Sequence, residues 1–314
     1  MRRVIRKTAL LKMEGKLSKN NFEILAEFAL QNPSFSVRRA EERTSRSVEE
    51  IARAVSELTE RGYVADGEIT EAGLEALEPY RAKRAIFLAA GFGSRMVPVT
   101  LDTPKPLVRV NGKRIIDGLI DACLGAGIEE IYIIRGYLGE RFDELLEKYP
   151  MIKFIENPLY DKANNISSAL LARELLQNAY VFEADLLLAN PEIVTKYHCG
   201  SDFLAIPMDK TDDWCFEVED GFIVKEKVGG ENCWQMVGIS YWSVEDGAKL
   251  CEDIARAYES EGGHDRYWEQ VPLVFFKDRY KVAVRECRAE DIVEIDTFDE
   301  LCQLDPSYKE YGKK

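Results

Sequence analysis

The stretch "LAAGFGSRMVPVTLDTPKPL", residues 88–107, decides the fold prediction for this chain. It continues the apolar run at residues 84–90, which is typical of a buried strand. A glycine-rich loop after the first strand of an α/β sheet lets backbone amides approach phosphate groups closely. Gly91 and Gly93 supply that freedom, and Arg95 can grip phosphate oxygens through two hydrogen bonds. The stretch therefore predicts a phosphate-binding loop.

This loop is not one of the two commonest phosphate-binding motifs. Met96 stands where the dinucleotide-binding fingerprint has its third glycine, and no G-K-[ST] follows as in a P-loop. A bound dinucleotide and a Walker-type nucleotide site are therefore both disfavoured.

Downstream of the loop, strand-like and helix-like segments alternate. The expected strands are 84–90, 130–135, 151–156, 179–184 and 202–208, and the expected helices are 115–127, 139–148, 165–177 and 244–260. A hairpin is expected to turn at Asp220-Gly221. This order predicts a Rossmann-like α/β domain at residues 82–314, with a mixed, mostly parallel sheet and helices on both faces.

Residues 1–81 are expected to form a separate, small domain. Three helical segments are followed by two short strands around Asp66-Gly67 and by another helix, which is the order of a winged helix-turn-helix. Such a domain binds DNA, or it serves in packing or dimerisation. The expected recognition helix disfavours DNA because acidic residues outnumber its Arg53 and Arg61. Residues that favour DNA binding are Arg38, Arg39, Arg43 and Arg46.

Composition and charge exclude several classes of function. The first 84 residues carry a net charge of +2 and the remainder −16, so the larger part disfavours nucleic acid. The seven cysteines include no C-x-x-C pair, which argues against zinc and disulfides and favours a reducing cytoplasm. No apolar run approaches the roughly 20 residues of a membrane span, and the N-terminus lacks a signal-peptide core.

The whole ordered string resembles a family signature. L-A-A-G-x-G-S-R, followed by Pro98, Thr100 and Pro104–Leu107, is similar to that of nucleotidyltransferases, which couple a nucleoside triphosphate to a phosphorylated sugar or alcohol. The resemblance implies that Lys105 lies between the two reacting phosphates and that Arg95 holds the leaving pyrophosphate. The nucleotide-binding residues that it implies are Leu88, Ala89, Ala90, Gly91, Gly93 and Ser94. Asn164, Asn165 and Ser168 form a second wall, or their segment only begins a helix.

Two aspartates match the acidic positions of this family. Asp185 follows a strand in "EADLLL", and Asp296 lies in "IVEIDT" with Glu294 nearby. A carboxylate after a strand is also common as a cap or turn former. The resemblance implies that Asp185 and Asp296 hold Mg²⁺, since hard oxygen ligands suit a magnesium ion bound to a triphosphate.

One branch of the family matches further along the chain. "KTDDWCFEV", "HDRYWEQV" and "IVEIDT" are similar to segments of bacterial CTP:phosphocholine cytidylyltransferases, and the similarity spans residues 84–300. It implies cytidylyl transfer from CTP to phosphocholine, giving CDP-choline and pyrophosphate. A quaternary ammonium is recognised by aromatic faces and nearby carboxylates. The candidate acceptor-binding residues, whose aromatic members could also be core, are Asp213, Trp214, Asp265, Tyr267, Trp268 and Glu294.

Other readings stay open. The acceptor is alternatively 2-aminoethylphosphonate, phosphoethanolamine or a sugar 1-phosphate. A second alternative is a transcriptional regulator that senses a nucleotide without turning it over. Retention of Arg95, Lys105, Asp185 and Asp296 together favours turnover. The sequence does not decide the oligomeric state, and a homodimer is one alternative.

Overall fold

The computed structural model describes residues 17–31 and 34–311. The chain divides into two compact units, Met1–Arg81 and Ala82–Lys314, which are described here one at a time. Residues 1–16, where the sequence predicts no signal peptide, lie outside the described residues. Within the described part of the chain, no helix has the length and apolar character that crossing a membrane requires.

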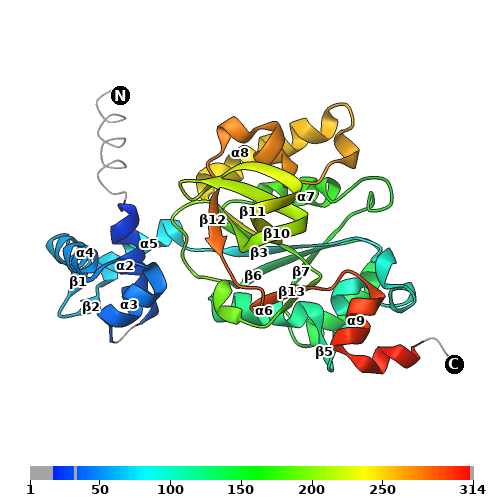
Figure 1. The fold of residues 1–314 in the computed structure, drawn as a ribbon, viewed down its shortest axis with the longest axis horizontal. Coiled ribbons are helices and arrows are strands. Elements are labelled where there is room, and N and C mark those ends of the chain that lie inside the picture. Colours follow the sequence, from blue (N-terminus) through cyan, green and yellow to red (C-terminus); the bar gives the residue numbers. More distant parts are fainter. Residues whose placement is uncertain (1–16, 32–33, 312–314) are drawn as a thin grey trace. The chain divides into compact units, whose positions relative to one another are not determined.

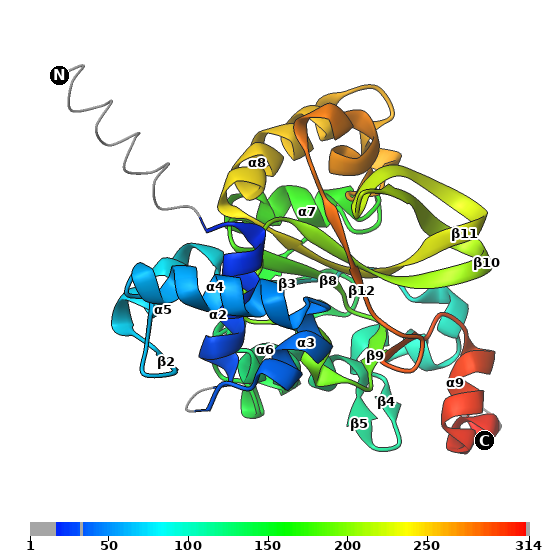
Figure 2. The same ribbon diagram turned by 60° about the vertical axis from the view of Figure 1, so that its left-hand side comes forward.

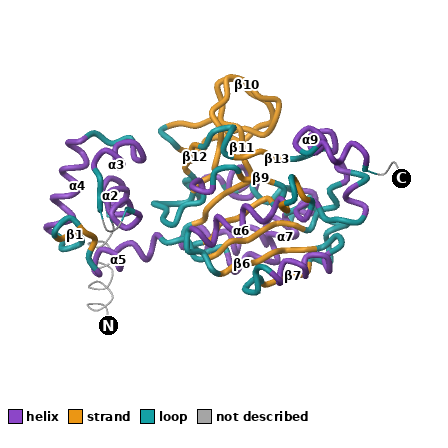
Figure 3. Tube along the Cα trace, turned by 90° about the horizontal axis from the view of Figure 1, so that it is seen from below, coloured by secondary structure: helices purple, strands orange, loops and turns teal. Residues whose placement is uncertain are grey.

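The first unit consists of short helices and one small hairpin (Figure 3). Its elements are α2 (Lys19–Leu30), α3 (Val37–Thr44), α4 (Val48–Glu60), β1 (Val64–Ala65), β2 (Glu68–Ile69) and α5 (Glu71–Leu77). Ser18, Ser36 and Ser47 cap the first three helices with their side chains. Ile51 and Leu58 of α4 are buried, and Val55 between them is half-buried. The winged-helix assignment remains a prediction from the sequence.

The second unit is built on one mixed, mostly parallel sheet. Its strands are β3 (Arg84–Ala89), β6 (Glu130–Arg135), β7 (Lys153–Glu156), β8 (Ala179–Glu183), β10 (Asp202–Glu219), β11 (Phe222–Trp242) and β12 (Ala283–Glu286). They lie in the order β10–β12–β11–β8–β3–β6–β7. β3 pairs in parallel with β6 and β8, whereas β11 runs antiparallel to β8. The predicted fold class is confirmed.

Helices cover both faces of this sheet (Figure 1). They are α6 (Ile115–Gly125), α7 (Ile166–Ala172) and α8 (Val244–Glu259). Alternate residues of β3 face opposite ways: Phe87 packs in the core that contains Ile116 of α6, and Ile86 packs in the core that contains Ile166 of α7 and Leu250 of α8. The central strand β3 is therefore packed on both faces. The loop that follows it starts from a well-packed position in the sheet.

Two of the expected helices differ from the prediction. Residues Gly139–Glu147 form 3-10 turns in place of an α-helix, and Gly139, a poor helix former, begins them. The helix expected at 165–177 is shorter, because α7 ends at Ala172 and a 3-10 turn, Arg173–Leu175, follows it. Neither difference changes the order of the strands in the sheet.

A long hairpin and a short strand pair complete the unit. β10 and β11 extend beyond the sheet as an antiparallel hairpin (Figure 2) and turn at Asp220-Gly221, as predicted. β9 (Leu186–Leu188) pairs antiparallel with β13 (Ile292–Glu294), and β4 (Arg109–Val110) with β5 (Lys113–Arg114). The last helix, α9, spans Phe298–Leu304. The β9–β13 pair joins two distant parts of the chain at the edge of the site described next.

Candidate active site

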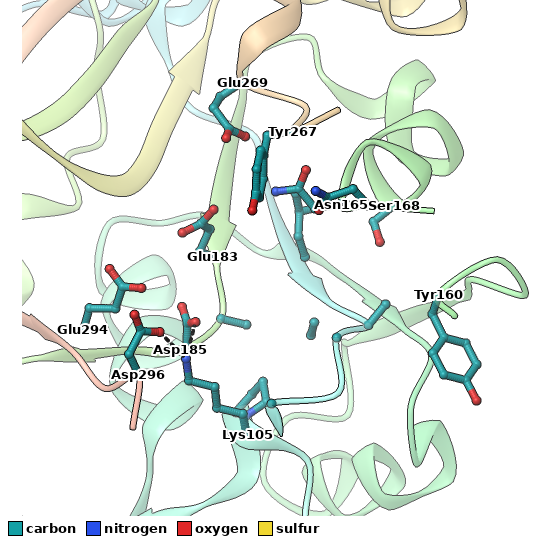
Figure 4. Close-up of a pocket in the computed structure, with 18 of the residues that line it drawn as sticks. Lys105, Tyr160, Asn165, Ser168, Glu183, Asp185, Tyr267, Glu269, Glu294 and Asp296 are labelled. Atoms are coloured by element: carbon teal, nitrogen blue, oxygen red, sulfur yellow. Dashed lines mark hydrogen bonds and ion pairs between the residues drawn. The ribbon is translucent and has the colours of Figure 1, made fainter. Parts of the chain in front are cut away.

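A cavity of about 500 Å³ lies at the carboxyl ends of β3 and β8 (Figure 4). This volume is in the range of small-molecule sites. It is lined by residues of the loop after β3, the start of α7, the end of β8, the β10–β11 hairpin, and the segments around 267 and 294. The predicted site residues that line it are Leu88, Ala89, Ala90, Gly91, Gly93, Ser94, Arg95, Lys105, Asn164, Asn165, Ser168, Asp185, Asp213, Trp214, Tyr267, Glu294 and Asp296.

The glycine loop folds tightly back on itself. Gly93 has φ +61°, and a Cβ there would meet Thr100 Cγ2 at 3.0 Å and Lys105 Cβ at 3.1 Å. The hydroxyl of Thr100 donates to the Gly93 carbonyl at 2.8 Å. Only glycine fits this close approach without strain. The loop thereby brings Lys105, twelve residues further on, beside the glycines.

Lys105 lies between the two predicted acidic positions. Its Nζ donates to Asp185 Oδ2 at 2.7 Å and to Asp296 Oδ1 at 2.9 Å (Figure 4). The pairing of β9 with β13 explains why these aspartates meet: Asp185 directly precedes β9, and Asp296 follows β13 after Ile295. Arg95 also donates to Asp296, at 2.7 Å, although the Arg95 side chain is 67% exposed.

The charges of this cluster stabilise one another. Lys105 is only 8% exposed, and burial disfavours its charged form, yet Asp185 and Asp296 outweigh burial and raise its pKa. Burial likewise opposes the charge of Asp296, but Lys105 and Arg95 lower its pKa overall. Burial, then the charges of Asp185 and Glu269, raise the pKa of Glu183 well above its ordinary value. The cluster therefore holds an ionised lysine among excess carboxyl groups.

The donor set fits a hard divalent cation. Oxygen atoms of Glu183, Asp185 and Glu294 all lie within 4.8 Å of one another. Asp185 Oδ1 is buried and has no hydrogen-bond partner among the described residues. Asp296 is outside this group of three and bonds to Lys105 and Arg95. The residues around Asp185 thus suit Mg²⁺, with Glu183 as an acidic side chain that the sequence reading missed.

Gly238 on β11 leaves room for the Glu183 side chain, and its replacement gives a testable effect. A Cβ at Gly238 would lie 2.6 Å from Glu183 Oε2, and the backbone φ of Gly238 is +68°. Gly221, on the same hairpin, has φ +80° and open space around it. Both Gly→Ala variants should lose about 1 kcal/mol or more from the left-handed backbone. Gly238→Ala should lose more, because Glu183 must also shift.

Urea denaturation of both variants measures this difference in the free energy of unfolding. An equal loss for Gly221→Ala and Gly238→Ala would mean that Glu183 is not held against the β11 backbone.

The second predicted wall is formed by the residues that begin α7. Asn157 Nδ2 donates to the hydroxyls of Ser167 and Ser168, each at 3.0 Å. Asn165 makes no side-chain cap for α7, and its Oδ1 accepts from the Trp268 amide at 2.8 Å. Asn164 donates from Nδ2 to the Asp265 carbonyl at 3.3 Å. The segment is therefore more than a helix cap, since its side chains tie this wall together.

The predicted acceptor-binding residues separate into two groups. Trp214 and Tyr267 line the cavity with ring centroids 5.7 Å apart, in an edge-to-face arrangement, and Asp213 lines it beside them. Trp268 is 3% exposed and packs in the core against Phe203 and Trp242, which corrects its expected role in a ligand cage. Its polar sequence surroundings concealed that successive residues here face opposite ways.

Asp265 is corrected as well. It is exposed and is not among the cavity-lining residues, and only its backbone carbonyl touches the wall, through Asn164. Glu269, which the sequence reading passed over, lines the cavity instead and is 3% exposed. The sequence could have indicated Glu269 through its position two residues after Tyr267, which was already a predicted site residue. Further cavity-lining residues that were not predicted are Pro106, Asn157, Tyr160, Ala163, Ser167, Glu183, Ala184 and Met236.

Comparisons with known proteins find nucleotidyltransferases among the relatives of this chain. Residues 84–199 match the family model described as "Nucleotidyl transferase". The chain is similar to a 2-aminoethylphosphonate cytidylyltransferase of Lancefieldella rimae, with 36% identity over 71% of this chain and 92% of the relative. It is also similar to a choline-phosphate cytidylyltransferase of Streptococcus pneumoniae, with 34% identity over 72% of this chain and 98% of the relative.

A solved structure shares the fold of the second unit. The structure of CTP:phosphocholine cytidylyltransferase from Streptococcus pneumoniae covers 72% of this chain and 99% of its own, with a TM-score of 0.65 and 33% identity. Similarity of this extent, at this identity, supports the family resemblance that the loop at residues 88–107 suggests.

Proposed function

Because the chain belongs to the nucleotidyltransferase family, we propose that it transfers the cytidylyl group of CTP to a small phosphate or phosphonate that carries an ammonium group. Phosphocholine, the acceptor expected from the sequence, and 2-aminoethylphosphonate both meet this description. Relatives that act on each of the two have similar identity to this chain, 34% and 36%. Identity therefore does not rank the two acceptors.

One observation carries the proposal. A single cavity is lined by the glycine loop, by the Lys105–Asp185–Asp296 cluster and by a wall of Trp214 and Tyr267. The first two features suit a triphosphate, and the third suits a cation, because aromatic faces attract positive charge. A sugar 1-phosphate offers no cation to such a wall.

In the proposed reaction, an oxygen of the acceptor phosphate or phosphonate attacks the α-phosphorus of CTP. A new P–O–P bond forms, the bond between the α- and β-phosphates breaks, and pyrophosphate leaves with the bonding electrons. The acceptor oxygen is already ionised at neutral pH, so no general base is needed. Catalysis then consists of positioning and of charge neutralisation.

Lys105 and Arg95 supply the positive charge from the protein. The raised pKa of Lys105 keeps it ionised, so it can counter the repulsion between the acceptor phosphate and the α-phosphate. Arg95, exposed on the loop, is free to exchange its contact with Asp296 for the oxygens of the leaving pyrophosphate. Asp185, with Glu183, Glu294 and Asp296 as its acidic neighbours, would hold Mg²⁺. Bound there, the ion would neutralise charge on the triphosphate.

Release of pyrophosphate tests the proposed function. The purified protein is assayed with Mg²⁺ and CTP or UTP, each paired with phosphocholine, 2-aminoethylphosphonate, phosphoethanolamine or glucose 1-phosphate. The proposal expects turnover with CTP and the ammonium-bearing acceptors. Turnover only with glucose 1-phosphate would contradict it, and silence with every pair would favour the nucleotide-sensing alternative.

Two tryptophans should respond differently to the same substitution. Trp214→Leu should raise KM for the acceptor far more than KM for CTP, because Trp214 lines the cavity beside Tyr267. Trp268→Leu should instead lower the free energy of unfolding by about 2 kcal/mol or more, as expected for a buried aromatic residue that is truncated. Steady-state kinetics and urea denaturation of both variants measure the two effects. The same changes in KM and in the free energy of unfolding for both variants would contradict the assignment of Trp214 to the cavity and Trp268 to the core.

A further inference from the structure

Glu269 is a buried, cavity-lining carboxyl group with one oxygen that has no hydrogen-bond partner among the described residues. It lines the cavity next to Tyr267 (Figure 4) and is 3% exposed. Its Oε2 is buried and has no hydrogen-bond partner among the residues that the structure describes. A buried polar atom without a partner is costly, so a ligand that donates a hydrogen bond would stabilise it.

Glu226 adds a second unsatisfied carboxyl group near the first. Both of its carboxyl oxygens are buried and lack a partner within the described part of the chain. Glu226 pairs across the hairpin with Phe216, whose ring contacts Phe203, and Phe203 in turn stacks on Trp268. Cross-strand partners share one face of a sheet, so Glu226 is on the face toward Trp268, behind the cavity-lining residues rather than among them. The charge of Glu226 acts on Glu269 and contributes to raising its pKa.

Both carboxyl groups favour a positively charged occupant. Burial raises the pKa of Glu269 to about 8, with a further contribution from Glu226, and burial alone raises that of Glu226 to about 7. Burial removes the water that would stabilise an ionised carboxylate. A cation beside the carboxyl groups replaces that stabilisation and favours their ionised forms.

The kind of cation follows from hydrogen-bonding capacity. A trimethylammonium group has no N–H and leaves the unpartnered Oε2 of Glu269 as it is. A primary ammonium has three N–H donors and can give one of them to this oxygen. Trp214 and Tyr267 attract either cation, so the aromatic wall does not distinguish them. The carboxyl oxygens do.

We propose that Glu269, with Glu226, selects an acceptor that carries a primary ammonium group, so that 2-aminoethylphosphonate or phosphoethanolamine is preferred over phosphocholine. This inference rests on the proposed cytidylyl transfer and names its acceptor class. It reverses the order in which the sequence resemblance ranks the acceptors. The alternative is that the site attracts the ammonium group by charge alone, in which case phosphocholine would react as well as the primary ammonium acceptors.

A methylation series tests the preference in the unmodified protein. Pyrophosphate release is measured with CTP and phosphoethanolamine, and then with its N-methyl, N,N-dimethyl and N,N,N-trimethyl (phosphocholine) forms. The kcat/KM should fall along the series, by about tenfold or more overall, since a site built for N–H donors rejects analogues that lack them. Equal or rising values would overturn the inference while leaving cytidylyl transfer intact. 2-Aminoethylphosphonate is assayed beside the series, and turnover with it but not with phosphocholine supports the inference. No turnover with any of these five acceptors would overturn the proposed function, and the inference with it.

Isosteric variants locate the selectivity. Glu269→Gln should raise KM for phosphoethanolamine, leave KM for CTP unchanged and reduce the ratio between the two end members of the series. Glu226→Gln should do the same to a smaller extent. Glu231→Gln, exposed on the same strand β11, is the matched control and should keep the wild-type ratio. A wild-type ratio in both Glu226→Gln and Glu269→Gln would overturn the assignment.

Discussion

Replacing Lys105 with methionine should lower kcat by a factor of about 10²–10³, the size of effect found when one charge-stabilising donor is removed from an active site. Methionine is unbranched like lysine and one atom shorter, so it keeps most of the packing and loses the charge and the N–H donors. Lys105 is the buried cation shared by Asp185 and Asp296, whereas the exposed Arg95 contacts only Asp296. KM for CTP should change much less than kcat, because the charge acts mainly as the new bond forms.

The matched control for this substitution is Lys113→Met, at an exposed position of β5. Circular dichroism of both variants checks that each is folded, since loss of Lys105 also leaves two carboxylates without their common partner. A folded Lys105→Met protein with the kcat of the control would remove Lys105 from the catalytic machinery.

Asp185→Asn should lower activity by about a thousandfold at a fixed magnesium concentration, because a bound metal contributes several kcal/mol of charge stabilisation. The variant keeps the shape of the side chain and replaces one charged oxygen with an amide. Binding of Mn²⁺, followed by electron paramagnetic resonance, should weaken in parallel. This second readout separates loss of the metal from a general loss of activity.

Asp209→Asn is the control for that experiment, because Asp209 is exposed on β10 and is not among the cavity-lining residues. It should bind Mn²⁺ as the wild type does. Wild-type Mn²⁺ affinity in Asp185→Asn would place the metal elsewhere, whatever the activity of the variant.

The fold of the larger unit could be predicted because its signals are local. Residues 84–89 are buried on both faces, so they form a continuous apolar run that is readable without the rest of the sheet. The loop after them has two glycines, and Gly93 requires the left-handed backbone that only glycine adopts freely. The hairpin at Asp220-Gly221 follows from the same preference.

The details of the site depend on contacts that no local pattern contains. β9 and β13 are three-residue strands more than one hundred residues apart, and their pairing brings Asp185 and Asp296 together. Trp268 and Tyr267 are neighbours in one polar string, yet one lies in the core and the other in the cavity. Lys105 follows a glycine-rich loop, where a lysine is usually exposed. It is buried here beside Asp185 and Asp296, which come from distant segments of the chain.

Phosphorus-31 NMR of the reaction products tests the central claim most directly. The protein is incubated with Mg²⁺, CTP and an equimolar mixture of phosphoethanolamine, 2-aminoethylphosphonate and glucose 1-phosphate. The account predicts pyrophosphate together with the paired resonances of a cytidylyl ester of one of the two ammonium-bearing acceptors, while glucose 1-phosphate persists. Unchanged CTP, or a cytidine diphosphate sugar in place of such an ester, would contradict it.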